Sequence, residues 1–321
     1  MGYPTKYGVI GPLGIHSQYM NGNLKDCVLE DKIEIMTEYG TLTPQYDFSS
    51  FRKKLVSSMS FYEDGTLRRI SLNNPTKVKT PIGIREAELL TFYECGAIKR
   101  LFPLNGHLSA YWEEEDEYEL AKEDSFDLPC GKITTKVISV YFYKDGGIKS
   151  LTFWPREIIS VLTPIGGVQV RIGVSFYQDG RIHSLEPASP TFIKTPIGII
   201  QAFDENANGI LGDNNSLILS KDGTLCSLIT STQRIIVKNL ESKAQTIYSP
   251  SQELEEDGEE IWFRPLKIEF EKGSVRLNDG ERIDISQHQF MIQPYHKIGF
   301  SPCSNCASCG GCSMEGKIEA S

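Results

Sequence analysis

The stretch that decides the fold is "GVQVRIGVSFYQDGRIHSLEP", residues 167–187. The apolar residues of its first half occupy alternate positions: Val168, Val170, Ile172, Val174 and Phe176. A period of two is typical of a β-strand that is buried on one face. Asp179-Gly180 follows at once, and Asp-Gly between apolar stretches is a strong signal for a tight hairpin. The stretch therefore predicts two antiparallel strands joined by a short turn.

The length of the turn fixes which residues face each other across the hairpin. A three-residue loop ending in Gly180 pairs Phe176 with Ile182, whereas a two-residue turn pairs Tyr177 with Ile182. We expect the three-residue loop, because it places Ile182 on the apolar face of the first strand. A slip of one residue would turn every side chain to the opposite face. Each cross-strand apolar pair contributes up to about 1 kcal/mol relative to Ala–Ala.

The same pattern returns along the chain. Its other copies are "SFYEDGTLRRISL" from Ser60, "TFYECGAIKRLF" from Thr91, "YFYKDGGIKSLTF" from Tyr141 and the weaker "ILSKDGTLCSLIT" from Ile218. The same register rule pairs Phe61 with Leu67, Phe92 with Ile98, Phe142 with Ile148 and Leu219 with Leu225. Leucines at four positions break the alternation and suggest that the outer face is partly covered: Leu72, Leu101, Leu151 and Leu185.

A second turn element alternates with the first. It reads "TPIG" at Thr80, Thr163 and Thr195, with "LPCG" at Leu128 and "TEYG" at Thr37 as variants. Proline suits the second position of a type I turn, and the following glycine accepts a left-handed conformation. Since no long segment has a helical period, we expect an all-β antiparallel meander of hairpin repeats, forming an elongated sheet or a solenoid. Residues 1–300 form this body, with a sub-boundary near 230–260, and residues 301–321 form a short cysteine-rich tail.

The "FYxDGxIxSL" unit resembles the variant MORN-like hairpin repeat, whose core reads approximately "YYENGKLKSE". The resemblance covers a minority of the chain, and the "TPIG" turn and the irregular spacing of the turn glycines depart from that pattern. It implies an elongated sheet built from hairpins, and a role in scaffolding, lipid contact or partner binding.

The residue three positions after the turn glycine is basic in the four strong copies, at Arg68, Lys99, Lys149 and His183, and at Lys25 in a degenerate copy, "QYMNGNLKDCVL" from Gln18. In the expected register these residues face away from the Phe–Ile layer. Stacked hairpins would align them into a basic stripe that could bind an anionic surface or acidic partner. Alternatively, they form an ordinary solvated face that pairs with nearby Asp and Glu.

The tail contains "SPCSNCASCGGCSM", residues 301–314, with cysteines at Cys303, Cys306, Cys309 and Cys312. Thiolates are soft ligands for zinc, copper(I) and iron–sulfur clusters. Zinc knuckles have a longer separator than the two residues between Cys306 and Cys309. The run resembles the cluster loop of bacterial ferredoxins, C-x2-C-x2-C-x3-C-P, although its last gap is one residue short and Ser313 replaces the proline. The four cysteines are therefore the predicted metal ligands, for an iron–sulfur cluster or, alternatively, zinc.

Other interpretations of the tail remain open. Cys303, Cys306 and Cys309 could wrap three corners of a cluster, while the fourth ligand is Cys312 or a residue of the body such as His288 or His296. The small residues between the cysteines suit a tight cluster loop and equally suit a redox-active or unstructured thiol tail.

Composition excludes several classes of function. The 321 residues carry a net charge of −9 with a pI near 5.2, which disfavours nucleic acid as a partner. No apolar run reaches the length of a membrane helix, and the N-terminus lacks a signal-peptide pattern. We therefore expect a cytoplasmic protein with reduced thiols, in which the other cysteines are free and half-buried: Cys27, Cys95, Cys130 and Cys226.

Three polar stretches interrupt the hairpin pattern. Residues 112–126 and 253–260 are acidic and are expected to form solvated loops, with a divalent-cation site or a docking strip as the sharper alternatives. Residues 204–215 are expected to lengthen a hairpin, since a calcium loop would need Glu where Asn215 stands.

No metalloprotease, nucleophile-elbow, P-loop or dinucleotide motif is present in the sequence. The sequence therefore favours a non-catalytic binding or scaffold module that engages a protein partner and carries a soft-metal site in its tail. The alternatives are a redox accessory protein that docks a cluster to an enzyme, and a β-solenoid enzyme of unknown reaction.

Overall fold

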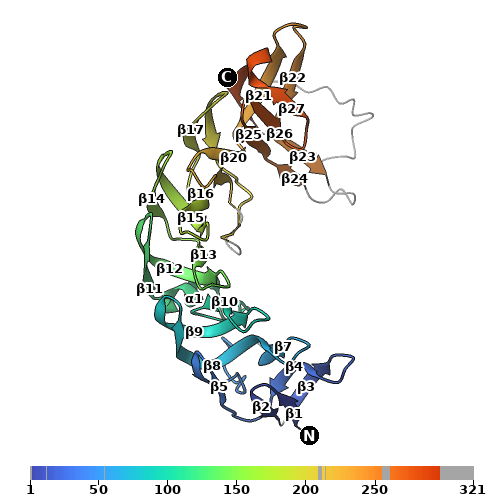
Figure 1. Ribbon diagram of the computed structural model, residues 1–321, viewed down its shortest axis with the longest axis vertical. Helices are drawn as coiled ribbons and strands as arrows, with labels where there is room; N and C mark the ends of the chain where they lie inside the picture. The colour runs from blue at the N-terminus through green and yellow to red at the C-terminus, as the bar shows by residue number, and fades with distance from the viewer. Residues whose placement is uncertain are drawn as a thin grey trace, which may run out of the picture.

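The computed structural model of the chain is an elongated, curved, all-β molecule (Figure 1). It describes residues 2–11, 13–53, 55–208, 212–213, 215–254 and 261–296. Every pairing between its named strands is antiparallel, as the sequence predicts. Within the described ranges the helical elements are α1 (Glu114–Leu120) and the 3-10 helix η1 (Ile285–Gln287). No helix in this part of the chain has the length and apolar character to cross a membrane.

One long sheet, the main sheet, runs through the molecule. Its strands pair in the order β3 (Leu13–Gln18), β4 (Leu24–Leu29), β7 (Met59–Phe61), β8 (Leu67–Thr80), β9 (Gly83–Phe92), β10 (Ile98–Phe102), β12 (Gly131–Phe142), β13 (Ile148–Phe153), β15 (Gly166–Phe176), β16 (Ile182–Pro187), β19 (Leu217–Leu219), β20 (Leu225–Thr230), β25 (Leu266–Glu271), β26 (Ser274–Leu277) and β27 (Arg282–Asp284). β3 and β27 each pair with one neighbour among the described strands, and they lie toward opposite ends of the molecule. The main sheet is therefore open.

The "TPIG" turns and their variants form a second series, the Thr-Pro hairpins. They are β1 (Tyr3–Thr5) with β2 (Gly8–Ile10), β5 (Ile35–Thr37) with β6 (Gly40–Leu42), the outer halves of β8 and β9, β11 (Glu123–Leu128) with the start of β12, β14 (Ile159–Thr163) with the start of β15, and β17 (Thr191–Thr195) with β18 (Gly198–Ala202). Near the C-terminal end lie a three-stranded sheet and one more pair: β21 (Gln233–Asn239), β22 (Gln245–Tyr248) and β28 (His288–Pro294), and β23 (Ser251–Leu254) with β24 (Ile261–Arg264).

The long strands β8, β12 and β15 belong to both series. The start of β12 pairs with β11, and its second half pairs with β13. The pairings of all three strands shift at the point where they leave the main sheet, and such bulges allow a strand to turn a corner. In β15 the shift contains Ile172, whose φ of 63° is unusual for a β-branched residue. Ile172 is buried outside the main core cluster, so the predicted alternation is wrong at this residue.

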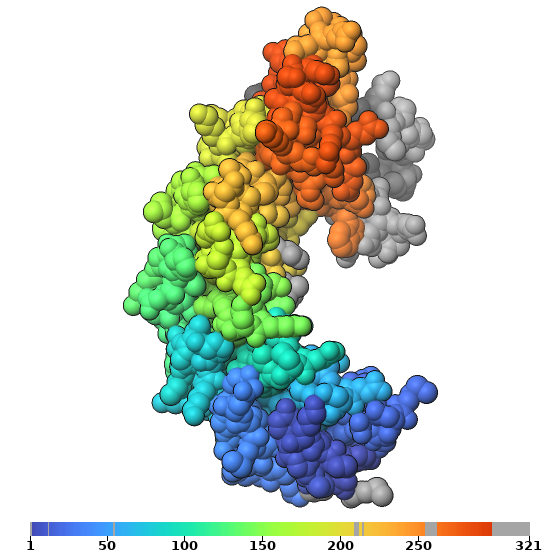
Figure 2. Space-filling view, viewed as in Figure 1, coloured from blue at the N-terminus to red at the C-terminus, as the bar shows by residue number. Residues whose placement is uncertain are grey.

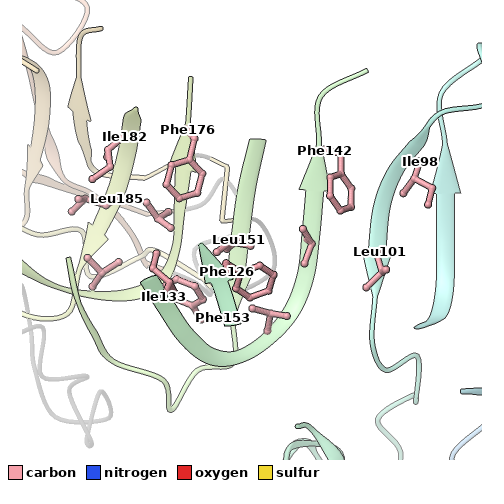
Figure 3. Close-up of a cluster of buried hydrophobic side chains, with 14 of the residues drawn as sticks. Ile98, Leu101, Phe126, Ile133, Phe142, Leu151, Phe153, Phe176, Ile182 and Leu185 are labelled. Atoms are coloured by element: carbon pink, nitrogen blue, oxygen red, sulfur yellow. The ribbon is translucent and has the colours of Figure 1, made fainter. Parts of the chain in front are cut away.

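The core lies between the main sheet and the Thr-Pro hairpins. Four of the Thr-Pro hairpins each contribute a directly paired apolar couple to the same cluster as the main sheet: Ile35–Leu42, Phe126–Ile133, Val161–Val168 and Ile193–Ile200. Figure 3 shows Phe126 and Ile133 close to Leu151 and Phe153 of β13. The buried cluster extends from Ile10 to Leu277, so each hairpin packs on its neighbours along one continuous core.

The predicted register is confirmed in all five copies. Phe176 pairs with Ile182, Phe61 with Leu67, Phe92 with Ile98, Phe142 with Ile148 and Leu219 with Leu225. A bulge follows each turn and inserts one extra residue, so two consecutive residues lie between inward-facing positions. Leu101, Leu151 and Leu185 are therefore buried on the inner face, and the inference that they mark a covered outer face is wrong.

Local hydrogen bonds explain both turns. In the Asp-Gly turns the carboxylate accepts from the backbone N–H two residues on, as in Asp64–Thr66 at 2.9 Å and Asp179–Arg181 at 3.1 Å. In the Thr-Pro turns the threonine hydroxyl donates to the carbonyl of the turn glycine and accepts from the intervening N–H, as Thr163 does at 2.7 and 3.2 Å. The same two bonds recur at Thr5, Thr37, Thr80 and Thr195.

The tyrosine of each "FY" pair, and Tyr19 at the corresponding position after Gln18, connects its hairpin to the next. Its hydroxyl donates to a backbone carbonyl one hairpin further along: Tyr19 to Phe61, Tyr62 to Phe92, Tyr93 to Phe142, Tyr143 to Phe176 and Tyr177 to Leu219, at 2.8–2.9 Å. Ser220 stands at the corresponding position of the next hairpin, so this tyrosine ladder ends there. Each such bond contributes about 1 kcal/mol.

The two series of turns also contact each other. The turn glycine Gly146 packs so closely on Pro81 that an added Cβ would lie 2.7 Å from the proline Cβ. Gly180 meets Pro129, and Gly223 meets Pro164, in the same way. These contacts hold the Thr-Pro hairpins against the main sheet.

Two predictions about the polar stretches are wrong. Residues 112–126 do not form a simple solvated loop, because they contain α1 and the buried Glu117. Residues 204–215 do not lengthen a hairpin, because the described part of this segment lies against the main sheet, where the Gly212 N–H bonds the Thr152 hydroxyl at 3.0 Å. Most of the acidic run at 253–260 lies outside the described residues.

Candidate functional site

The four predicted metal ligands, Cys303, Cys306, Cys309 and Cys312, lie outside the described residues. Within the described ranges no cluster of three or more His, Cys, Asp or Glu has the geometry of a metal site. His288, a candidate fourth ligand, is held in the body, since its Nδ1 lies 2.8 Å from the Asp284 carbonyl and its Nε2 lies 3.1 Å from the Asn239 amide. Both ring nitrogens therefore already have partners.

The other four cysteines are free thiols. Cys27 is buried in the core, and burial raises its pKa to about 12, which keeps it protonated and unreactive. Burial also raises the pKa of Cys130. Cys95 is exposed and Cys226 is half-buried, so the expectation of half-buried thiols holds for two of the four.

The outer face of the main sheet carries a continuous line of directly paired residues, the outer row. It consists of Asp26, Ser60, Arg69, Thr91, Arg100, Tyr141, Ser150, Ser175, Ser184, Ile218, Ser227, Glu269, Arg276 and Arg282. Nearly all of these side chains are polar. Neighbouring residues of the row, such as Arg100 and Tyr141 or Ser227 and Glu269, come from separate hairpins, so any binding surface on this face is assembled by strand pairing.

A hollow of about 410 Å3 opens on the outer row between β4 and β10, and we call it the β8–β10 hollow. Its lining residues are Asp26, Ser60, Tyr62, Arg68, Arg69, Thr91, Phe92, Lys99 and Arg100. Four of them are basic, and Asp26 is the acidic one. Burial lowers the pKa of the Arg69 guanidinium, while the nearby charge of Asp26 opposes that change.

Sequence reasoning identified two of these four basic residues, Arg68 and Lys99, and missed Arg69 and Arg100. The missing signal is the bulge after each turn. Because the bulge adds one residue, the third and fourth positions after the turn glycine lie together between inward-facing Leu67 and Ile70, or Ile98 and Leu101. Each hairpin thus presents a pair of outer-face residues to the hollow.

The remaining residues of the predicted stripe stack on aromatic rings. The Lys149 ammonium lies 4.5 Å from the centre of the Tyr141 ring, and Lys25 lies 5.8 Å from that of Tyr19. His183 packs edge-on against Tyr177 with ring centres 4.8 Å apart. Burial lowers the pKa of His183, and the nearby charge of Lys149 lowers it further.

Next to the β8–β10 hollow, part of residues 204–216 covers the outer row. Asp213 forms an ion pair with Arg100 and accepts a hydrogen bond from Ser150. The Arg100 guanidinium also lies over the Tyr141 ring, 4.1 Å from its centre. Arg100 is therefore fixed at the boundary between the open and covered parts of the row.

Beside the covered part of the row, two residues along β16 from Ser184, lies a buried carboxyl group, Glu186, at 1% exposure. Burial raises its pKa to about 7, although it accepts a hydrogen bond from the Ser216 N–H at 2.8 Å, and the nearby charge of Asp204 raises the pKa too. The backbone pairs Glu186 with Arg171, whose guanidinium donates instead to the Asp204 carbonyl at 2.7 Å.

A second hollow, of about 540 Å3, lies between β8, β9 and the segment that contains α1. Arg52, on its wall, forms a fork with Glu88 at 2.7 and 2.9 Å and with Glu117 at 2.6 and 2.8 Å. Trp112 and the Gly106 N–H also donate to Glu117. Hydrogen bonds to the two carboxylates outweigh the effect of burial and raise the pKa of Arg52. Because the three charged groups satisfy one another, this network serves to anchor the segment to the sheet.

No family model matches the sequence, and a comparison with curated proteins finds no match either.

Proposed function

We propose that the protein is a non-catalytic binding or scaffold module with a soft-metal site in its C-terminal segment. The observation that carries the first half is the amphipathic character of the Thr-Pro hairpins. Their inner faces fill the core, and their outer faces expose large apolar side chains, including Met36, Leu162 and Phe192 at 82%, 75% and 68%. Exposed apolar residues on successive hairpins of an extended array suit a protein partner.

The curved outline of the molecule supports this proposal (Figure 2). An array that extends by adding hairpins offers surface in proportion to its length, which suits a scaffold. The acidic net charge of −9 disfavours nucleic acid as the partner. Free thiols in the body fit a reducing compartment, and we propose the cytoplasm. The relationship to MORN-like repeats is part of the proposal, supported by the quoted sequence pattern.

The partner surface can be tested by introducing charge on the outer faces of the Thr-Pro hairpins. In a proximity-labelling or pull-down comparison, Leu162→Glu combined with Phe192→Glu should lose the partners that the wild-type chain retains. Gln169→Glu is the matched control, since Gln169 lies exposed on the same hairpin as Leu162. Equal retention of partners by all three proteins would contradict the proposal.

The metal half of the proposal rests on the spacing of Cys303, Cys306, Cys309 and Cys312. We propose an iron–sulfur cluster, with zinc as the alternative, because thiolates at this spacing can wrap a cubane more readily than a single ion. In the alternative redox function, the protein is an accessory protein that presents the cluster to an enzyme.

Elemental analysis and an absorption spectrum of protein purified without oxygen test this half. The full chain should contain iron, or zinc, that a chain ending at Phe300 lacks. Cys306→Ser should lose the metal and keep the fold, whereas the control Cys95→Ser, which changes an exposed thiol of the body, should keep both. A full chain without either metal would contradict the proposal, and a reversible reduction of the bound cluster would favour the redox function.

A further inference from the structure

The β8–β10 hollow has an excess of positive charge. Its basic residues are Arg68, Arg69, Lys99 and Arg100. Asp26 in the wall and Asp213, which pairs with Arg100, offset two of these four charges and leave two. None of the ion pairs formed between described residues involves Arg68, Arg69 or Lys99. The acidic net charge of the whole chain makes this local excess distinctive.

The hollow also contains polar atoms without partners. The Arg69 Nε and the Thr91 Oγ1 are both buried, and neither has a hydrogen-bond partner within the described ranges. The two residues are directly paired across β8 and β9, so both atoms lie at one place in the outer row. Buried donors that lack partners are rare in folded proteins, and they are expected where a ligand supplies the missing acceptor.

Arg69, Thr91 and Arg100 follow one another across three paired strands. Neighbouring strands are about 4.8 Å apart, so the three residues occupy adjacent positions on the outer face, with Thr91 between the two arginines. Guanidinium groups bind phosphate oxygens through paired N–H donors, and a hydroxyl can donate one more hydrogen bond. Arg100 is held in place by Asp213 and the Tyr141 ring, so one side of the arrangement is fixed before a ligand arrives.

We propose that the β8–β10 hollow binds a small molecule that carries a phosphate monoester. A monoester has a charge of about −1.5 to −2 at neutral pH, which matches the two excess positive charges. The volume of about 410 Å3 exceeds what a phosphate group alone would fill and lies in the range of small-molecule sites. The phosphate contacts Arg69, Thr91 and Arg100, and Lys99 and Arg68 surround it. This inference is independent of the metal site in the tail.

Calorimetric titration of the full chain with phenyl phosphate tests the proposal. We expect one site per chain, and at least about tenfold weaker binding of phenyl sulfate, a monoanion of the same shape. Arg69→Gln should weaken phenyl phosphate binding by about tenfold or more, and Thr91→Val by a smaller factor. The control Arg181→Gln removes an exposed arginine that pairs with Asp179 in the turn between β15 and β16, away from the hollow, and it should bind like the wild type.

Several outcomes would overturn the proposal. They are no binding of phenyl phosphate by the wild type at millimolar concentration, equal affinities of Arg69→Gln and Arg181→Gln, and equal affinities for phenyl phosphate and phenyl sulfate. Inorganic phosphate that binds as tightly as phenyl phosphate would show a site for the free anion. Sedimentation with vesicles of phosphatidylcholine and phosphatidic acid, without binding of phenyl phosphate, would show a membrane headgroup site instead. Circular dichroism checks that each variant folds, and Lys99→Gln replaces Arg69→Gln if that variant does not.

Discussion

The two faces of the main sheet are built from the same strands and differ in almost every other respect. The inner face carries its own line of paired residues, the inner row: Cys27, Met59, Ile70, Leu90, Leu101, Val140, Leu151, Val174, Leu185, Leu217, Leu228, Ile268 and Leu277. All of these are apolar and at most 1% exposed. The outer row lies one residue away in each strand and is polar nearly throughout.

The inner face therefore holds the fold together, whereas the outer face gives each part of the molecule its own surface chemistry. The inner row is chemically uniform because every hairpin must bury the same face against its Thr-Pro cover. The outer row changes along the molecule. It is basic and open near Arg69, it is covered by part of residues 204–216 near Ser184, and it ends in charged residues near Glu269 and Arg276. Selection for a ligand or partner can act on the outer row without changing the core.

Truncation of neighbouring residues in one strand gives the largest expected contrast. Leu228→Ala should lower the free energy of unfolding by about 2–5 kcal/mol, because it leaves a cavity in the inner row. Ser227→Ala, one residue away in the outer row, should cost less than about 1 kcal/mol. Chemical denaturation of the two variants measures both values. Equal costs would mean that the outer face is also part of the core at this strand.

The pH dependence of stability tests the burial of Glu186, which lies where the outer face of the main sheet is covered. Its pKa is raised from 4.5 to about 7, so the folded state binds more protons than the unfolded state between these values. The stability that protonation provides is present below pH 4.5 and is lost as the pH rises to about 7. At 1.36 kcal/mol per pKa unit, the loss is roughly 3 kcal/mol.

Glu186→Gln should therefore flatten the pH dependence of the melting temperature over that range. The control Asp179→Asn, in an exposed turn, should keep the pH dependence of the melting temperature that Glu186 causes. If the wild-type protein were equally stable at pH 5 and pH 8, the carboxyl group would not be buried as described.

Two turn glycines with similar φ angles test the contact between the Thr-Pro hairpins and the main sheet. Gly146 has a φ of 91° and packs on Pro81, whereas Gly96 has a φ of 88° and open space where a Cβ would lie. Gly96→Ala should cost about 1 kcal/mol through backbone strain alone, and Gly146→Ala about 2–3 kcal/mol because the methyl group also displaces the proline. Thermal melts of the two variants show whether the Thr-Pro contact matters beyond the turn conformation. Equal costs would mean that it does not.

The smallest expected effect concerns the tyrosine ladder. Tyr143→Phe removes the hydrogen bond to the Phe176 carbonyl and should cost about 1 kcal/mol, because the carbonyl loses its donor. Tyr111→Phe, at a side chain that is 79% exposed, should change the free energy of unfolding by less than about 0.5 kcal/mol. Denaturation midpoints distinguish the two variants. If Tyr143→Phe leaves the free energy of unfolding unchanged, the hydrogen bonds of the tyrosine ladder do not stabilise the fold.

The sequence by itself determined the hairpins, their register and the direction of the apolar face. These features follow from local rules, since a period of two and an Asp-Gly turn act over about ten residues. The pairing of Phe176 with Ile182 could therefore be predicted. The position of Arg68 and Lys99 on the outer face could be predicted for the same reason.

Only the tertiary structure decided how the hairpins join. The corners in β8, β12 and β15, the buried Glu117 of α1 and the placement of Asp213 against Arg100 all depend on contacts between residues far apart in sequence. The β8–β10 hollow depends in addition on the bulge that brings Arg69 and Arg100 beside their predicted neighbours. Strand alternation is a local property of the chain, whereas the sharing of one strand by two layers is decided by which surfaces can be buried together.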